Sequence, residues 1–580
     1  MGIHKPEIGK MRVCIVGAGV SGLPAIKACI SEGLDVVCYE RSADIGGLWN
    51  YRPDLPNNGG TVMRSTVVNT SKEMMAYSDF PPPKEYPNFM HHSLVMNYVR
   101  AYAKHFDLTK YVKLNTEVKS IRRNSNETKW IVKLSSGQEE LFDKLMLCTG
   151  HHSIPQTPTF PGVRNFQGRT LHAKEYRDYR GFEGKDVFLI GIGNSALDIA
   201  VELTKVARTV TVSTRRGSWI FNRCAISGMP YDMIFQSRRY QWWMNTIPWS
   251  VANDFMEHQL QQRMCHDLYG LRPNHRFFQQ HPTVNDALVN LLASGQITIT
   301  EDVEYIEQDG VTVSGGRRFP ADVIIFCTGY TFGFSYLQPE NIIPINDHEV
   351  NLYKFVFPTN VSDIAVIGLI QPIGSVAPIS EIQSRWVARV FAGRCDLPSE
   401  SERQLDIDEK RKAMRRRYFR SKKHTIQVDY VPYMDELAKM IGCYPPIKQI
   451  ALSDFRFALR LFMGGNLPYA YRLVGPDSWP EAREAIWTAP ERVKFPMKNR
   501  QCRTRRHIRR GTVDEYFRYV SMKWLAGFTI YILIAGLWAF CSGPTGISFL
   551  SYFSYVFLFF FVFSFMLLWF DLQFDMSTIF

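Results

Sequence analysis

Closely spaced cysteine pairs of the Cys-X-X-Cys type are absent from this sequence of 580 residues. None of its eleven cysteines stands in a Cys-X-X-Cys pair, and their spacing predicts neither a disulfide framework nor a zinc site. We also expect no cleavable signal peptide, because the first ten residues are polar and the apolar run at 11–17 is too short for one. These absences predict a chain that folds in a reducing compartment and carries no redox dithiol and no bound metal.

Acidic residues are absent from residues 492–510, which hold nine lysines and arginines. This run supplies much of the formal net charge of +13, and the rest of the chain is only mildly basic. A basic run next to an apolar segment is typical of a membrane surface. We therefore expect membrane lipid as a partner and no nucleic acid, with residues 491–520 as a basic juxtamembrane linker.

Charged residues are absent from two runs near the C-terminus, 524–541 and 547–570. At about 1.5 Å per residue they would extend about 27 Å and about 36 Å, and the hydrocarbon core of a bilayer is about 30 Å thick. The sequence therefore predicts a helical membrane anchor at 521–580, as a two-helix hairpin or as one span plus an interfacial helix. A buried pair of soluble helices is the alternative, although such helices usually carry a polar face. The basic run before the anchor predicts that the preceding chain faces the cytosol.

In the rest of the chain short apolar strands alternate with helical patterns, which indicates α/β layers. The first clear unit has a strand at 12–16, a glycine-rich turn, a helix from about Leu23 and a strand at 35–39 that ends in Glu40. Glycines let the backbone approach a pyrophosphate, the helix N-terminus supplies N–H donors, and the acid accepts a ribose hydroxyl. The unit predicts a dinucleotide site built by Gly17, Ala18, Gly19, Val20, Ser21, Gly22 and Glu40.

The second unit begins at Asp186 and repeats this order with the turn Gly191-Ile192-Gly193-Asn194-Ser195-Ala196. Its second strand, 209–213, ends in Thr214-Arg215-Arg216 instead of an acid. A carboxylate there would repel a 2′-phosphate, whereas guanidinium groups pair with it. The unit therefore predicts NADP rather than NAD, bound by Gly191, Gly193, Asn194, Ser195, Ala196, Leu197, Asp198, Thr214, Arg215 and Arg216.

Two dinucleotide sites in one chain imply one cofactor that remains bound and one that binds and dissociates in each turnover. FAD and NADPH fit these two roles. Strands that close into Cys148-Thr149-Gly150 and Cys327-Thr328-Gly329 indicate where the chain crosses between the two units. The predicted fold is α/β, with two Rossmann-like dinucleotide-binding domains for FAD and NADP and a C-terminal helical membrane anchor. The predicted domains are the first part of the FAD domain at 1–160, the NADP domain at 161–329 with an insertion near 215–300, and the second part of the FAD domain at 330–490.

The segment 166–176 stands just before the second glycine turn and matches the signature FxGxxxHxxx(Y/F), with His172 and Tyr176 at its marked positions. By this segment, and by residues 44–49, 69–74, 327–330 and 368–372, the sequence resembles the animal flavin-containing monooxygenases of the dimethylaniline N-oxide-forming type. The resemblance extends over roughly residues 10–490. The chain departs from the family at Cys327, where an alanine is usual, and in a tail with two apolar runs where one anchor is usual.

The resemblance implies that NADPH reduces FAD, and that a C4a-hydroperoxyflavin formed with O₂ oxygenates soft nucleophilic nitrogen or sulfur atoms of small lipophilic compounds. It further implies a protein of the endoplasmic reticulum membrane in xenobiotic metabolism. Asn69 matches the family's active-site asparagine, whose amide holds the activated oxygen and the nicotinamide ribose. A turn asparagine is the alternative. The resemblance adds Asn69 and Thr70 to both cofactor sites, and adds to the FAD site Gly47, Leu48, Trp49 and Gln371.

Three other functions are compatible with parts of the pattern. A disulfide reductase would share both nucleotide folds, but it needs a redox Cys-X-X-Cys pair that the sequence lacks. A Baeyer-Villiger oxygenase of ketones is the main alternative, although that family normally has tryptophan where Tyr176 stands. A non-enzymatic membrane scaffold that binds NADP is the third. We expect His172 to be a structural imidazole and not a general base.

Overall fold

A parallel sheet of five strands forms around the first glycine turn. The computed structural model describes residues 10–53, 62–225, 228–346, 349–418 and 425–498. Every neighbouring pair of this sheet is parallel, and β1 and β2 lie at the residues where the sequence predicts them. The strand order is β25 (Ile364–Val366), β7 (Lys144–Leu147), β1 (Arg12–Val16), β2 (Asp35–Tyr39) and β3 (Val112–Lys113).

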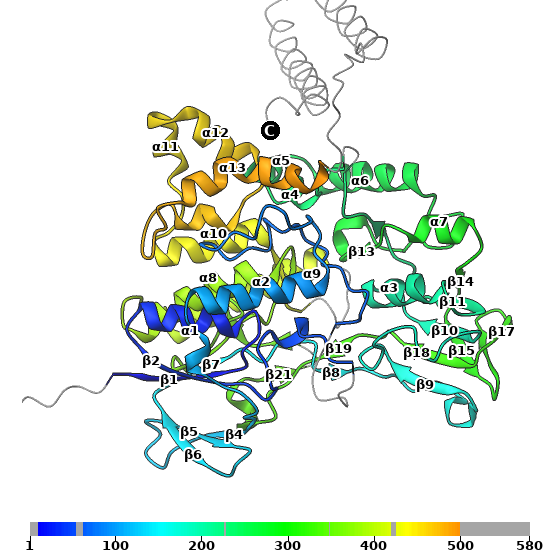
Figure 1. Ribbon diagram of the computed structural model, residues 1–580, viewed down its shortest axis with the longest axis horizontal. Helices are drawn as coiled ribbons and strands as arrows, with labels where there is room; N and C mark the ends of the chain where they lie inside the picture. The colour runs from blue at the N-terminus through cyan, green and yellow to red at the C-terminus, as the bar shows by residue number, and fades with distance from the viewer. Residues whose placement is uncertain (1–9, 54–61, 226–227, 347–348, 419–424, 499–580) are drawn as a thin grey trace, which may run out of the picture. The chain divides into compact units, whose positions relative to one another are not determined.

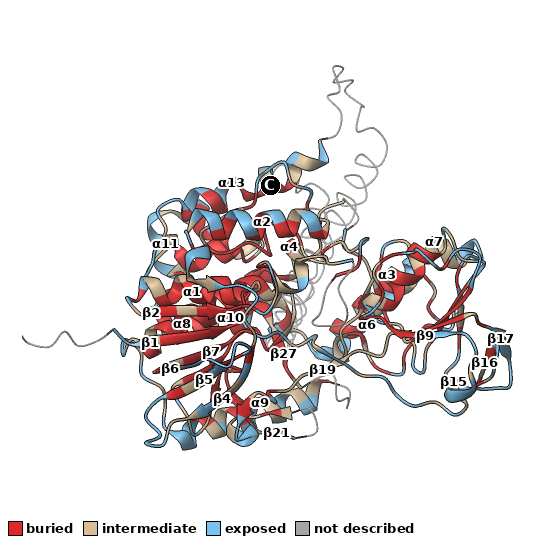
Figure 2. Ribbon diagram, turned by 60° about the horizontal axis from the view of Figure 1, so that its bottom comes forward, coloured by how far each residue is buried: buried red, intermediate tan, exposed pale blue. Residues whose placement is uncertain are grey.

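Helices cover one side of this sheet and an antiparallel meander lies on the other (Figure 1). The helices are α1 (Gly22–Ser31), α2 (His92–His105), α8 (Val376–Phe391) and α10 (Tyr430–Ile441). The meander consists of β4 (Val118–Arg123), β5 (Trp130–Leu134) and β6 (Glu139–Phe142), and β20 (Leu337–Gln338) pairs with β4 in parallel. Buried residues concentrate in the strands of the first sheet and in α8 and α10, which form the largest hydrophobic core (Figure 2).

A second parallel sheet of five strands repeats the plan of the first. Its order is β14 (Thr298–Thr300), β11 (Thr209–Ser213), β10 (Asp186–Ile190), β18 (Val323–Phe326) and β9 (Arg169–His172). It too carries a meander, made of β15 (Val303–Ile306), β16 (Gly310–Val313) and β17 (Arg318–Pro320), and it packs against α3 (Asn194–Leu203) and α7 (Leu288–Ala293). In both units the strand after the meander closes into Cys-Thr-Gly. The chain therefore contains two α/β dinucleotide folds, as the sequence predicts.

The two crossings between these units pair with each other. Shortly after the first Cys-Thr-Gly comes β8 (Ile154–Pro155), and directly after the second comes β19 (Tyr330–Thr331). The two strands are antiparallel. The two segments at which the sequence predicts crossings between the units are therefore hydrogen-bonded to each other. The remaining short strands pair as β12 (Ile220–Phe221) with β13 (Thr283–Val284), β21 (Ile345–Asn346) with β22 (Glu349–Val350), β23 (Leu352–Tyr353) with β24 (Phe357–Pro358), and β26 (Gln371–Ile373) with β27 (Gln427–Asp429).

A helical insertion separates β11 from β14 in the second unit. It contains β12, β13 and the helices α4 (Asp232–Phe235), α5 (Arg238–Thr246) and α6 (Trp249–Arg263). The insertion contacts the first unit, because Arg238 Nη2 donates to Asp435 Oδ1 of α10 at 2.8 Å and Ser237 forms a β-bridge with Gly465. An insertion that lies in the second unit by sequence is therefore bonded to the first unit in space.

Helices dominate the end of the described chain: α9 (Glu400–Arg417), α11 (Ile447–Ser453), α12 (Phe455–Met463) and α13 (Ala482–Lys494). Within the residues that the structure describes, no helix combines the length and the apolar character needed to cross a bilayer. The two apolar runs of the predicted anchor, 524–541 and 547–570, and most of the basic linker lie outside the described residues.

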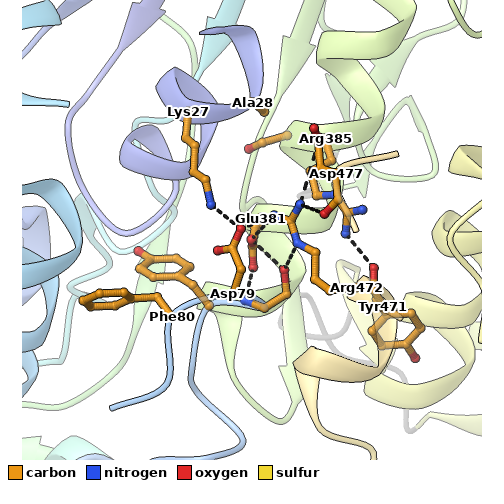
Figure 3. Close-up of polar contacts among 12 residues, drawn as sticks. Lys27, Ala28, Asp79, Phe80, Glu381, Arg385, Tyr471, Arg472 and Asp477 are labelled. Carbon is orange, nitrogen blue, oxygen red and sulfur yellow. Dashed lines mark hydrogen bonds and ion pairs between the residues drawn. The ribbon is translucent and has the colours of Figure 1, made fainter. Parts of the chain in front are cut away.

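A buried network of charges joins α1, α8 and the segment before α13 (Figure 3). Arg472 Nη2 lies 2.8 Å from Glu381 Oε1 and 3.1 Å from Asp79 Oδ2, and Lys27 pairs with Asp79. Burial favours the neutral form of Asp79, but Arg472 and Lys27 together hold its pKa below the usual value. The network ties late residues of the chain to the first glycine-turn helix.

Candidate active site

A cavity of about 1080 Å³ opens at the carboxyl ends of the first sheet's strands. This is the edge where parallel α/β sheets bind their ligands, because the glycine turn and the helix N-terminus meet there. Segments distant in sequence line it, including the first glycine turn, Asn69–Thr70, residues 148–154, residues 370–377 and part of the insertion. The cavity is thus bounded by both halves of the first unit and by the insertion of the second.

The first glycine turn is too tight for side chains at two of its positions. Gly17 has φ +99°, and a Cβ there would lie 2.7 Å from the carbonyl oxygen of Cys148. A Cβ on Gly22 would lie 1.9 Å from the carbonyl oxygen of Gly17, which excludes any larger residue without opening the turn. Bare backbone at the start of α1 fits the pyrophosphate of FAD.

Glu40 lies at the end of β2 and lines the same cavity. Its Oε2 accepts a hydrogen bond from the backbone N–H of Ala18 at 2.8 Å, and its Oε1 accepts one from the N–H of Ser42 at 2.9 Å. A carboxylate has acceptor capacity for about four hydrogen bonds, so Glu40 can hold the turn and still accept a ribose hydroxyl. The residues around the first turn therefore fit FAD.

The second glycine turn also lies close to the Cys-Thr-Gly segment of its own unit. Gly191 has φ +115°, and a Cβ there would lie 2.5 Å from the carbonyl oxygen of Cys327. Gly193 differs, because a Cβ on it would meet no atom within 4 Å. Packing within the protein does not require a glycine at this position, whereas close approach of a phosphate does. Arg215 and Arg216 follow β11 and are exposed, so this end of the second sheet fits a phosphorylated ribose.

The structure gathers most of the predicted FAD residues but few of the predicted NADP residues around the cavity. Of the FAD set, only Ala18 and Gly22 do not line it. Of the NADP set, Asn69, Thr70 and Asn194 line it, and Ala196 and Leu197 are buried in the core of the second unit. The predicted NADP residues outside the lining are Gly191, Gly193, Ser195, Ala196, Leu197, Asp198, Thr214, Arg215 and Arg216.

Two insertion residues that sequence reasoning missed hold the Asn69 turn. Arg223 Nη2 donates to Asn69 Oδ1 at 2.8 Å, and Asp232 Oδ2 accepts from the backbone N–H of Ser71 at 2.6 Å. Burial raises the pKa of Asp232 to about 6, although the hydrogen bond from Ser71 opposes the rise. Neither residue belongs to a recognisable motif, and a contact across 154 positions leaves no local signal in the sequence.

Aromatic side chains from the insertion line the cavity. Tyr231 and Phe235 stack with their ring centroids 5.2 Å apart, and Phe221 packs against Tyr231 at 4.8 Å. Such rings offer a large apolar surface with little loss of side-chain freedom. The aromatic lining residues of the insertion are Phe221, Tyr231, Phe235, Tyr240, Trp249, Phe277 and Phe278.

His172 has the contacts of a structural imidazole, as the sequence predicts. Its Nε2 lies 3.1 Å from the carbonyl oxygen of Gly329, and its Nδ1 accepts from the N–H of Lys174 at 3.0 Å. Burial lowers its pKa, so the ring stays neutral near neutral pH. The signature segment builds the edge strand β9, and buried Tyr176 donates to Glu202 of α3 at 3.1 Å.

Two dinucleotide folds and a shared cavity with an aromatic wall define a two-dinucleotide flavoprotein oxidoreductase. The family model described as flavin-binding monooxygenase-like matches residues 10–536. The chain therefore belongs to this family, and it is an FAD-containing, NADPH-dependent monooxygenase.

Named relatives cover most of the chain. It is 42% identical over 502 residues to flavin-containing monooxygenase 5 of Homo sapiens, covering 85% of this chain and 94% of that protein. It is 41% identical over 500 residues to dimethylaniline monooxygenase [N-oxide-forming] 2 of Macaca mulatta, covering 84% and 93% respectively.

Solved structures share the fold at lower identity. S-allyl-L-cysteine S-oxygenase from Allium sativum has a TM-score of 0.58 at 23% identity, covering 83% of this chain and 99% of that chain. Cyclohexanone monooxygenase from Rhodococcus sp. Phi1 bound to NADP+ has a TM-score of 0.56 at 16% identity, covering 75% and 98%.

Proposed function

We propose that this monooxygenase oxygenates soft nucleophilic nitrogen or sulfur atoms of small lipophilic compounds. The observation that carries the proposal is the set of aromatic side chains that the insertion contributes to the cavity lining, which offers apolar contacts to a lipophilic compound. FAD, once reduced by NADPH, supplies the oxygen-activating chemistry. A soft nucleophile needs no activation by the protein, so the residues have only to bind it, orient it and exclude water.

Asn69 is the side chain we propose to act at the reacting atoms. It lines the cavity next to the first glycine turn, and its amide is a neutral donor and acceptor. A fixed donor of this kind stabilises charge that develops on oxygen. The insertion supplies the substrate wall and shields this region from water.

Oxygenation of ketones is the second candidate, supported by the fold shared with cyclohexanone monooxygenase. Tyr176 argues against it, because the ketone-oxygenating family normally has tryptophan at this position.

Product identification by mass spectrometry separates these functions. The purified enzyme, given NADPH, oxygen, a thioether, a tertiary amine and a ketone, is expected to form the sulfoxide and the N-oxide. An ester from the ketone as the main product would select the second candidate. No NADPH-dependent oxygen consumption at all would select a non-enzymatic role.

The choice of NADPH over NADH is expected to depend on Arg215 and Arg216. Replacing both by alanine should raise the KM for NADPH strongly and the KM for NADH little. The loss of binding free energy for NADPH should be about 1.5 to 3 kcal/mol for each charged partner removed. Steady-state kinetics with both coenzymes measure the difference. Arg317→Ala is the matched control, since it removes an exposed ion pair with Glu301 in the same unit. Equal losses with both coenzymes would assign Arg215 and Arg216 a structural role.

We further propose that residues 521–580 anchor the enzyme to the endoplasmic reticulum membrane, with the catalytic domain in the cytosol. The supporting features are the two uncharged runs and the basic run before them. Truncation after residue 523 is expected to release the protein from membranes with its FAD absorbance intact. Sedimentation after a high-salt wash is the measurement, and a truncated protein that still pellets contradicts the anchor.

Glycosylation gives a second check on the orientation. The sequons at Asn126 and Asn360 are exposed, so a lumenal domain would be modified there and a cytosolic domain would not. We expect the electrophoretic mobility of the protein to stay the same after treatment with a glycosidase.

A further inference from the structure

The Asn69 turn is held from outside its own domain. Arg223 follows β12 and Asp232 begins α4, so both side chains come from the insertion of the second unit. Arg223 binds the side-chain amide of Asn69, and Asp232 binds the backbone of Ser71 two residues later. The insertion therefore fixes both the backbone of the turn and the side chain of Asn69.

The contact with Arg223 decides which way the Asn69 amide faces. A guanidinium group only donates hydrogen bonds, so the amide atom 2.8 Å from Arg223 Nη2 has to be the oxygen Oδ1. The NH₂ group at the other end of the amide then faces away from Arg223, and it bonds to no other residue that the structure describes. Since Asn69 lines the cavity, the free donor is available to a ligand there.

Arg223 is itself immobilised. Its Nη1 lies 2.6 Å from Asp286 Oδ2, and its backbone N–H donates to Asp286 Oδ1 at 3.0 Å. The Arg223 side chain is only 11% exposed, and an arginine paired on both arms of its planar fork has little freedom to rotate. Asp286 thus holds Arg223 in the orientation that Asn69 requires.

We propose that Arg223 is a positioning residue that orients the Asn69 amide so that its NH₂ group donates into the cavity. This inference rests on the proposed function, in which Asn69 acts at the reacting atoms. Productive turnover converts NADPH, H⁺, O₂ and substrate to NADP⁺, oxygenated product and water. Unproductive turnover converts NADPH, H⁺ and O₂ to NADP⁺ and hydrogen peroxide. A correctly oriented amide delays the release of peroxide, so Arg223 favours the first reaction over the second.

The test measures hydrogen peroxide release and NADPH oxidation by the FAD-loaded, full-length enzyme without substrate, and then product per NADPH with a thioether. The variants are Arg223→Ala, Arg223→Lys, Asn69→Ser and the double variant Arg223→Ala/Asn69→Ser. Arg223→Ala is expected to raise substrate-free peroxide release about tenfold, the factor given by losing one hydrogen bond to a charged group. Arg223→Lys should recover part of the loss, because an ammonium can donate to Oδ1 but lacks the fork that also binds Asp286.

The double variant separates positioning from a merely structural role. If Arg223 acts through Asn69, the double variant releases peroxide no faster than Asn69→Ser alone. Additive effects, or wild-type peroxide release by Arg223→Ala, would overturn the proposal. Arg272→Ala is the matched control, because it breaks an exposed pair with Asp267 within the same insertion and should behave as wild type. A wild-type enzyme that forms no sulfoxide contradicts the proposed substrate class, while the substrate-free measurement still decides the role of Arg223.

Discussion

Replacing Arg472 by methionine is expected to lower the free energy of unfolding by about 3 to 5 kcal/mol, the usual effect of removing one partner of a buried ion pair. Arg472 and Glu381 are each only 3% exposed, so water cannot solvate the carboxylate that is left behind. Lys27 still pairs with Asp79 in the variant, but Glu381 keeps only its hydrogen bonds from Ser78. Arg472 also donates to Ser78 Oγ at 2.6 Å and to the carbonyl oxygen of Asp477 at 2.8 Å, and these bonds are lost too.

Denaturant unfolding followed by tryptophan fluorescence measures this change. The matched control is Arg122→Met, which removes a pair with Glu139 whose side chains are 44% and 41% exposed. Exposed pairs contribute about 0.2 to 1 kcal/mol, so the control should shift the unfolding midpoint only slightly. Equal effects of the two substitutions would mean that the buried network contributes no more than a surface pair.

Replacing Gly22 by alanine is expected to give a protein without FAD. The added methyl group would lie 1.9 Å from the carbonyl oxygen of Gly17 and 2.9 Å from its carbonyl carbon, both of which belong to the backbone and cannot rotate away. Relief requires the turn to open, which displaces the N–H donors at the start of α1 from the pyrophosphate. The second unit has an alanine, Ala196, at the corresponding position.

The ratio of flavin absorbance to protein absorbance after purification measures FAD content. Gly33→Ala is the control at the other end of α1, where φ is +80° and a Cβ would meet no atom within 4 Å. That substitution forces a non-glycine residue into a left-handed conformation at about 1 to 2 kcal/mol, but leaves the cavity untouched. A Gly22→Ala enzyme with full FAD content would show that the turn adapts.

Local patterns in the sequence predict the two dinucleotide folds well. The strands at 12–16, 35–39 and 209–213 occur at those residues, and the second unit begins at Asp186. This success has a physical cause, since a buried parallel strand, a glycine turn and a helix start follow one another within about 30 residues and each leaves its own local mark. Both Cys-Thr-Gly segments are recognisable for the same reason.

Long-range contacts could not be predicted in this way. Arg223 and Asp232 reach Asn69 and Ser71 only because the insertion folds back on the first unit, and the residues around them form no motif. The buried partners Arg472 and Glu381 are 91 positions apart and resemble surface charges in the sequence. Arg215 and Arg216 are identifiable from the sequence, because an NAD-binding fold has an acidic residue at the end of this strand. That they lie outside the cavity lining is a property of the folded chain.

The paired strands β8 and β19 have a mechanical consequence. A domain joined through one linker can rotate about several axes relative to its neighbour. Two linkers that are hydrogen-bonded to each other, as β8 and β19 are, act as a hinge with a single axis. The insertion bonds to α10 and to Gly465 at a second place, which opposes rotation about that axis. A body fastened at two separated places exchanges its visiting coenzyme by movement of side chains and loops, so rigidifying the hinge further should leave the rate of NADP⁺ release unchanged.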